Sequence, residues 1–363
     1  MHKGKGANVL GRQPRLSGFI SLAMEGECSS SHPSSSNGAD EPDHQVMSEI
    51  HLGCPPFSSG LHISHFTFPC PPVSDAERLR CVGGEIEQNI DLDEDGDLVL
   101  TRKGRPSNNV RLKIQHKITS SIPSVGLQVW KAELVLADFL LHKMFTSSDF
   151  DGVVALELGA GTGLLGILLA HVAKTVFLTD RGNEVLDNCY TNVHLNSQIF
   201  GDHQVSVYVR ELDWNNQWPP IPGSSQLSGG ERYKFSWSEE EIDEAMGASI
   251  LLAADVIYSD ELTDALFNTL QSLMSQGFPK VLYLALEKRY NFSLSDLNVV
   301  ANGYSHFRSY LKNEEELRHA GIRPSRCFVG ERNDYESIPQ YIREYDRGND
   351  VEIWQIKHIS ATN

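Results

Sequence analysis

Residues 153–166 read VVALELGAGTGLLG and join an apolar run to a glycine-rich turn and a second apolar run. The apolar residues 153–156 are typical of a strand that is covered on both faces of a parallel sheet. Glu157 follows, and the glycines at 159, 161 and 163 allow positive φ and a close approach of the backbone to a ligand. A helix expected from about residue 164 to 173 points its amide-rich N-terminus into the same crevice. The stretch therefore predicts a nucleotide-cofactor site in a doubly wound α/β fold.

Two classes of cofactor fit this turn, and the glycine spacing alone does not separate them. Gly161, Gly163 and Gly166 satisfy the dinucleotide-binding pattern G-x-G-x-x-G. Asp180 ends the next apolar segment, where an acid accepts hydrogen bonds from ribose hydroxyls in either class. These residues predict a cofactor that contains adenosine, either a nicotinamide dinucleotide or S-adenosylmethionine (SAM).

Five motifs within residues 123–359 resemble those of the seven-strand SAM-dependent methyltransferases, and in particular the protein-lysine methyltransferases of family 16. In chain order they are GLQVW at 126–130, ELGAGTG at 157–163, LTD ending at Asp180, LDW ending at Trp214, and ADVIY at 254–258. The resemblance implies a seven-strand Rossmann-like sheet, SAM as the cofactor with S-adenosylhomocysteine as its product, and a lysine on a protein as the methyl acceptor.

The resemblance also implies which residues bind the cofactor. They are Trp130, Glu157, Gly159, Ala160, Gly161, Asp180, Asp213, Trp214 and Ala254. The backbone of residues 159–161 would wrap the methionine end, Asp180 would hold the ribose, and Trp214 would lie against the adenine with Asp213 beside its amine. Taken alone, Trp130 and Trp214 would more often be core aromatics, and only their place beside the other motifs reverses that interpretation.

Asp255 and Tyr258 are the catalytic residues that the resemblance implies, facing the incoming lysine. Methyl transfer from a sulfonium to an amine is an in-line displacement in which positioning supplies much of the rate, so no metal is required. A free lysine ammonium has a pKa of about 10.4 and no lone pair for attack. We expect Asp255 to attract and orient the ammonium, Tyr258 to narrow its approach, and burial beside the sulfonium to favour loss of the proton.

The composition limits the partners. The chain has 363 residues, 40% of them hydrophobic, and a formal net charge of −17. Such an acidic chain, without a sustained basic cluster, disfavours nucleic acid as a partner and suits a basic protein substrate. No apolar run approaches the roughly 20 residues that cross a membrane, so we expect no membrane segment. We expect a monomer, and the family resemblance implies the nucleus and cytoplasm and a substrate among chaperones, translation factors or nucleic-acid-associated proteins.

The sequence divides into three parts. Residues 1–80 lack periodicity, include a serine- and proline-rich stretch, and are predicted to be a disordered or poorly structured tail. Residues 81–122 combine an acidic segment with a small β extension, in which 97–102 and 109–118 alternate like two paired strands. Residues 123–363 form the predicted methyltransferase domain.

Three irregular features are expected inside that domain. Residues 215–247 carry prolines, glycines and acids and are predicted to be a mobile insertion outside the core. A helix is expected near 293–302, and a strand near 304–310 is expected to accompany a final strand at 351–358. The alternation at 351–359 suits the antiparallel last strand of the methyltransferase sheet.

Other functions stay open from the sequence. A SAM-dependent methyltransferase of a non-protein acceptor would use the same cofactor site, although the base-amine tetrapeptide N-P-P-[YF] does not occur in the chain. A cofactor-binding scaffold protein is a second alternative, and a dehydrogenase is a more distant one.

Overall fold

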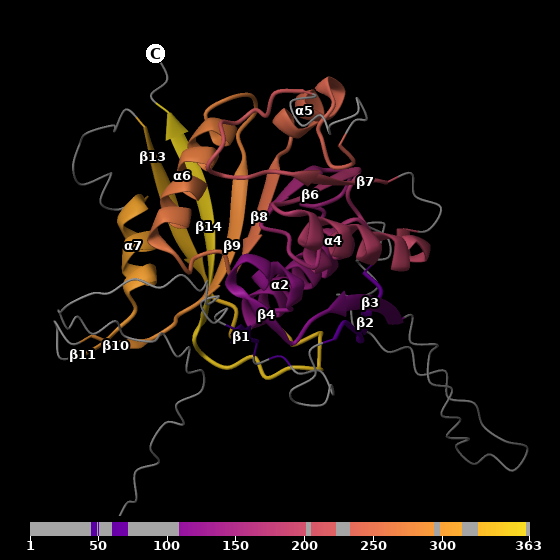
Figure 1. The fold of residues 1–363 in the computed structure, drawn as a ribbon, viewed down its shortest axis with the longest axis horizontal. Helices are drawn as coiled ribbons and strands as arrows, with labels where there is room; N and C mark the ends of the chain where they lie inside the picture. Colours follow the sequence, from indigo (N-terminus) through magenta and orange to yellow (C-terminus); the bar gives the residue numbers. More distant parts are fainter. Residues whose placement is uncertain are drawn as a thin grey trace, which may run out of the picture. The chain divides into compact units, whose positions relative to one another are not determined.

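The computed structural model describes residues 45–48, 50, 60–71, 109–200, 205–222, 233–293, 298–313 and 326–360. Their centre is an eight-stranded sheet with the order β12-β13-β14-β9-β8-β5-β6-β7 (Figure 1). Its strands are β5 (Val154–Leu158), β6 (Thr175–Asp180), β7 (Ser206–Glu211), β8 (Ile250–Ala254), β9 (Val281–Glu287), β12 (Leu311–Lys312), β13 (Arg326–Asn333) and β14 (Val351–Ser360).

The sheet is parallel from β9 to β7, and β14 runs antiparallel between β9 and β13. The strand order reverses between β5 and β8, which is where open α/β sheets form a ligand crevice at their carboxyl ends. The predicted doubly wound seven-strand methyltransferase sheet, including its antiparallel last strand, is confirmed. The two-residue β12, which pairs with β13 and forms the edge of the sheet, is an addition that the sequence does not predict.

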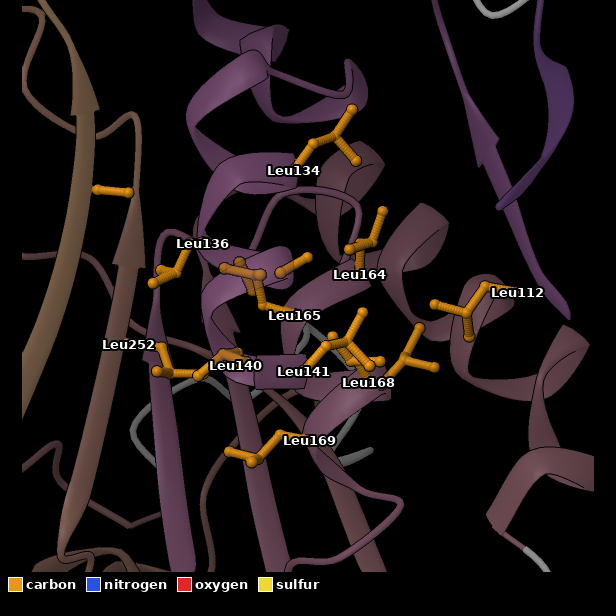
Figure 2. Packing of buried hydrophobic residues seen from close by; sticks show 14 of the residues in the cluster. Leu112, Leu134, Leu136, Leu140, Leu141, Leu164, Leu165, Leu168, Leu169 and Leu252 are labelled. Carbon is orange, nitrogen blue, oxygen red and sulfur yellow. The ribbon is translucent and has the colours of Figure 1, made fainter. Parts of the chain in front are cut away.

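Helices cover both faces of the sheet (Figure 1). The helices are α2 (Lys131–Thr146), α3 (Leu164–Leu169), α4 (Asn183–Leu195), α5 (Glu239–Met246), α6 (Asp260–Met274) and α7 (Asn302–Tyr310), with the 3-10 turns η1 (Ile122–Leu127) and η2 (Ser197–Phe200). The first three pack into one apolar cluster and the last three into another. Figure 2 shows leucines of α2 and α3, such as Leu140 and Leu165, gathered with Leu252 of β8.

Side chains of β5 alternate between these two clusters, as the pleat of a strand requires. Ala155 belongs to the cluster beneath α2 and α3, whereas Leu156 and Leu158 belong to the one beneath α5 and α6. Glu157, with the parity of Ala155, therefore points toward α2 and α3 and is 2% exposed. The strand places a carboxyl group in the core directly below the glycine turn.

Two strands form where the sequence predicts none. β2 (His62–Pro69) pairs antiparallel with β3 (Asn109–His116), and β1 (Gln45–Met47) pairs with β4 (Thr119–Ser121). The prediction of a disordered or poorly structured tail over residues 1–80 is therefore wrong for residues 45–47 and 62–69, because the alternation that buries Phe66 and Phe68 is obscured in the sequence by nearby histidines and Cys-Pro steps. The strand predicted at 109–118 is confirmed as β3. Its predicted partner at 97–102, like residues 1–43 and the acidic segment, lies outside the described residues.

Part of the predicted insertion is core. Trp218, Phe235, Trp237 and Ile242 are buried, so the expectation that residues 215–247 stay outside the core is wrong for the described residues 215–222 and 233–247. The acids that suggested a loop belong to the first turn of α5, where they complement the helix dipole and form a capping box with Ser238. Residues 223–232 lie outside the described part.

The segment before the last strand pair also differs from expectation. The segment predicted as a helix, residues 293–302, overlaps an antiparallel pair of short strands, β10 (Asn291–Ser293) and β11 (Asn298–Val300). The predicted strand at 304–310 is part of the helix α7. Tyr304, Phe307 and Tyr310 recur every third residue, which is a helical spacing, and Phe307 is fully buried. β14 pairs with β13 and not with residues 304–310.

None of the described helices has the length and apolarity that a bilayer span requires.

Gly166 tests this packing. A Cβ at this position would lie 2.1 Å from Cδ2 of Leu178 and 2.9 Å from Oε2 of Glu157. We expect Gly166→Ala to lower the free energy of unfolding by about 2 kcal/mol, because overpacking outweighs the roughly 1 kcal/mol by which alanine favours a helix. Urea unfolding measures the change. Gly60→Ala is the control, since a Cβ there meets nothing within 4 Å; equal stability of the two variants would contradict the prediction.

Candidate functional site

One cavity at the carboxyl ends of β5, β6, β7 and β8 collects every residue that the motifs single out. Its volume is about 1050 Å³ including the open mouth. The nine predicted cofactor-binding residues and the two predicted catalytic residues all line it: Trp130, Glu157, Gly159, Ala160, Gly161, Asp180, Asp213, Trp214, Ala254, Asp255 and Tyr258. The structure thus brings the predicted residues together, and their individual roles stay predictions.

The glycine turn after β5 forms the floor of the cavity. Gly159, Gly161 and Gly163 have φ values of 69°, 51° and 79°, a region that side chains with a Cβ rarely adopt. A Cβ on Gly161 would lie 3.0 Å from the carbonyl oxygen of Gly126, and a Cβ on Gly126 would lie 2.8 Å from Val185. The two backbones therefore cross in contact. Gly126 begins the GLQVW motif, but the sequence did not predict that its backbone would pack against the glycine turn.

Asp180 joins the floor to the next strand. Its Oδ2 accepts a hydrogen bond from the backbone N–H of Gly161 at 2.8 Å, and its Oδ1 accepts one from the N–H of Arg181 at 2.7 Å. Burial raises the pKa of this carboxyl above its ordinary value, and the two backbone hydrogen bonds oppose that rise. Each oxygen of an ionised carboxylate has two lone pairs, so Asp180 can accept two further hydrogen bonds, as a ribose diol would supply.

Trp214 forms an aromatic wall over the glycine turn. Atoms of its ring lie 3.4 Å from the place that a Cβ of Gly159 would occupy, whereas Cγ1 of Val256 lies only 2.8 Å from that place, so the approach of Val256 and the φ of 69° are what favour glycine there. Its indole Nε1 is buried and has no acceptor among the residues that the structure describes. A buried donor without a partner is costly, and an acceptor on a bound ligand would satisfy it.

Two carboxyl groups lie beneath the turn. Oε2 of Glu157 accepts a hydrogen bond from the N–H of Gly166 at 2.9 Å. Glu133, in the first turn of α2, accepts from the hydroxyl of Thr162 at 2.9 Å and from the N–H of Trp130 at 3.4 Å. Burial raises the pKa of Glu133 to about 7 and that of Glu157 well above its ordinary range. Glu133 was missed by sequence reasoning, and its only signal was its capping position after Trp130.

The lining of the cavity is strongly acidic. It contains five carboxyl groups, those of Glu133, Glu157, Asp180, Asp213 and Asp255, and the single guanidinium of Arg181. A pyrophosphate would be repelled by such a lining, whereas a sulfonium cation with an amino group would be attracted. Residues and charge together fit SAM. Among the described residues, no group of three or more His, Cys, Asp or Glu side chains is placed to hold a metal ion.

Asp255 has a charged partner that the sequence did not predict. Its Oδ2 lies 2.7 Å from Nη2 of Arg289, and the guanidinium carbon of Arg289 lies 5.0 Å from the ring centroid of Trp130. Asp255 is buried and has a φ of 55°. Its Oδ1 accepts a hydrogen bond from the N–H of Glu287 at 3.5 Å, so its carboxyl lies beside the end of β9. The sequence led us to expect a carboxylate that is free to attract an ammonium. In the structure, the guanidinium of Arg289 already neutralises part of the charge of this carboxylate.

Tyr258 lies at the mouth of the cavity and is 43% exposed. Burial of its hydroxyl and the nearby Asp180 raise its pKa above the ordinary value of a phenol, so the group is neutral at physiological pH. A neutral phenol can both donate and accept a hydrogen bond at the point where an acceptor would enter. The mouth of the cavity thus combines the ion-paired carboxylate of Asp255 with the phenol of Tyr258, and we call these two residues the doorway.

The fold and the acidic, glycine-floored cavity define a SAM-dependent methyltransferase. A family described as lysine methyltransferase matches residues 106–226. Methyltransferase-like protein 22 of Mus musculus is 37% identical over 286 residues, covering 78% of this chain and 68% of that protein. Its Homo sapiens counterpart is 38% identical over 267 residues, covering 73% of this chain and 62% of that protein. Protein N-lysine methyltransferase METTL21A of Danio rerio is 34% identical over 152 residues, covering 42% of this chain and 56% of that protein.

The chain belongs to the lysine methyltransferase family. The resemblance that the motifs indicated is confirmed, and with it SAM as the cofactor. A dehydrogenase function, which the glycine spacing alone allowed, is excluded by family membership and by the acidic lining of the cavity.

Cofactor choice can be measured directly. We expect calorimetric titration of the full chain to show binding of SAM and none of NAD, because only the former is cationic where the cavity is acidic. Asp180→Ala should weaken SAM binding by about 10- to 100-fold, since hydrogen bonds to a charged carboxylate contribute roughly 1.5–3 kcal/mol. Asp187→Ala is the matched control, as Asp187 pairs with Lys234 at the surface. Equal affinity of the two variants would contradict the role of Asp180.

Proposed function

We propose that this chain transfers the methyl group of SAM to the ε-amine of a lysine on a protein substrate. The observation that carries the proposal is the continuity of one acidic cavity from the glycine turn to the doorway of Asp255 and Tyr258. A donor held on the turn therefore has its reactive end toward an entrance that fits the long side chain of a lysine. Family membership and the name of the METTL21A relative, protein N-lysine methyltransferase, support a protein lysine as the acceptor.

The protein's part in the reaction is mainly positioning. Bound SAM supplies a methyl group that is already activated by the positive sulfonium. The glycine turn, Asp180 and Trp214 fix the position of the donor, and the narrow doorway restricts the direction from which an amine enters. Holding the two reacting atoms in line converts a bimolecular step into an effectively unimolecular one, which accounts for much of the rate.

Arg289 changes the expected role of Asp255. Because the guanidinium holds Oδ2 of Asp255, the doorway presents a carboxylate of fixed orientation with a cation beside it. The positive charge of Arg289 disfavours an entering ammonium relative to a neutral amine. Asp255 can still accept an N–H bond from that amine through its remaining lone pairs, which orients the nitrogen lone pair toward the donor. We infer that the pair selects a deprotonated lysine.

Substitution of Asp255 separates chemistry from cofactor binding. We expect Asp255→Ala to reduce methyl transfer by about 100-fold or more, because misplacement of a reacting nitrogen costs a factor of that order. SAM affinity should change by no more than about threefold, since the residue would act mainly on the acceptor. Methyl transfer from labelled SAM into lysate of cells that lack the enzyme measures the first quantity, and calorimetry measures the second. Equal loss of both would contradict the role.

Two further variants show whether the loss of activity comes from the missing carboxylate of Asp255 or from another effect of the substitution. Asp255→Ala leaves the cation of Arg289 unpaired, so the double variant with Arg289→Ala is needed. If it recovered the activity of the unmodified chain, the loss would come from the unpaired cation and not from the missing carboxylate. Asp243→Asn, at an exposed position of α5, is the control for removal of a negative charge.

Tyr258 should limit the number of methyl groups added. Its ring stands at the entrance, and a methylated amine needs more room than an unmodified one. We expect the unmodified protein to produce mainly mono- and dimethyl-lysine, and Tyr258→Ala to raise the trimethyl fraction severalfold, with Tyr258→Phe as the control that keeps the ring. Mass spectrometry of the labelled lysine in treated lysate gives the fractions. Abundant trimethyl-lysine from the unmodified protein would contradict this prediction.

We further propose that the substrate is a basic protein, such as a chaperone, a translation factor or a nucleic-acid-associated protein, and that the enzyme acts in the nucleus and cytoplasm. The formal net charge of −17 supports a basic partner. Cys189 and Cys327 carry free thiols, which supports a reducing compartment.

A further inference from the structure

Glu133 and Glu157 place two carboxyl groups under one glycine turn, although they come from different elements. Glu133 belongs to α2 and is 6% exposed, whereas Glu157 belongs to β5 and is 2% exposed. Both line the cofactor cavity. The charge of Glu133 is near enough to raise the pKa of Glu157. The two groups therefore respond to each other and to whatever enters the cavity.

Neither carboxyl has a cationic partner in the part of the chain that the structure describes. The hydroxyl of Thr162 and the N–H of Trp130 donate to Glu133, and the N–H of Gly166 donates to Glu157. These are neutral donors. They stabilise a carboxylate less than an ion pair does.

The groups that face the pair from the neighbouring elements are mostly acidic. They are Asp180 at the end of β6, the thiol of Cys189 on α4, and Asp255 after β8. The cations of this region are engaged elsewhere: Arg289 pairs with Asp255, Lys131 pairs with Glu287, and the N–H and guanidinium of Arg181 lie beside Asp180. Among the residues that the structure describes, no positive charge is therefore paired with either carboxyl of the cavity floor.

Two adjacent carboxylates in a poorly solvated space repel each other, and burial already disfavours each charge. Protonation of one of the two would remove this repulsion in the free protein. Burial raises the pKa of Glu133 to about 7, close enough for a nearby cation to shift the equilibrium at physiological pH.

We propose that the Glu133–Glu157 pair stores a proton in the free enzyme and releases it when the cationic methionine end of SAM enters the cavity. In that step a carboxyl O–H bond breaks, its proton passes to solvent, and the resulting carboxylate becomes the partner of the entering cation. Cofactor binding is then coupled to the loss of up to one proton. The inference rests on the proposed function only in requiring that SAM occupies this cavity.

The sign of the pH dependence follows. Below about pH 7 the free pair is protonated, so binding must release the proton, and SAM affinity rises with pH by up to about tenfold per unit. Once the free pair has ionised at higher pH, binding releases no proton and the affinity becomes flat. A cavity whose carboxylates were always ionised would show no such rise.

Calorimetry measures the released proton without any acceptor. SAM is titrated into the full chain at about pH 6.5 in two buffers of different ionisation enthalpy, such as phosphate and Tris, and the difference in heat gives the number of protons released. We expect roughly 0.5 to 1 proton for the unmodified protein. The double variant Glu133→Gln/Glu157→Gln, which keeps neither carboxyl, should release less than half of that while still binding SAM. Glu336→Gln, at an exposed loop position outside the cavity, should release as much as the unmodified protein.

The outcomes distinguish the two proposals. Intact SAM binding with the same heat in both buffers would overturn the proton coupling and leave the proposed function standing. Full release from that double variant would also overturn it, because the proton would come from another group. Absence of SAM binding altogether would overturn the proposed function, and the coupling with it.

Discussion

The site depends on the contact between two backbone segments that are far apart in the sequence. The turn after β5 crosses the segment before α2 so closely that a Cβ on Gly161 would lie 3.0 Å from the carbonyl oxygen of Gly126. Asp180, at the end of the neighbouring strand, holds the turn through the N–H of Gly161. Because the crossing joins β5, β6 and the entrance to α2, it sets the positions of Trp130, Glu133 and Asp180 around one cavity. A side chain at either glycine would separate these elements and open the floor.

The second organising feature is charge. A cavity with five carboxyl groups and one guanidinium attracts cations and repels phosphates, so its electrostatics select between cofactors that its glycines alone would accept. The same negative charge has a cost, since buried carboxylates repel one another. The structure reduces that cost differently at the two ends of the cavity. Arg289 neutralises Asp255 at the doorway, whereas Glu133 and Glu157 on the floor have only neutral donors.

Local sequence patterns predicted the strands of the central sheet, but they did not predict the structure of the segments at 215–247 and 304–310. Apolar runs with an acid at the carboxyl end identify parallel strands whose ends must meet at one edge, which is why the motif residues all line one cavity. Residues 304–310 alternate enough to suggest a strand, yet the three-residue spacing of Tyr304, Phe307 and Tyr310 packs as a helix. The described part of the insertion looked polar because the acids of α5 cap a helix whose other face buries Ile242. In each case packing against the sheet decided between two periods that the sequence allowed.

The sequence by itself determined the doubly wound fold, the glycine turn and the acids at the strand ends, because each depends on residue types within a few positions of one another. Only the tertiary structure decided which charges meet. Arg289 reaches Asp255 across 34 positions, and Glu133 reaches Thr162 across 29. No local pattern encodes such contacts, since they depend on how β9 lies beside β8 and how α2 lies over β5. The sequence thus specifies the cofactor site, and the assembled sheet specifies how its charges are balanced.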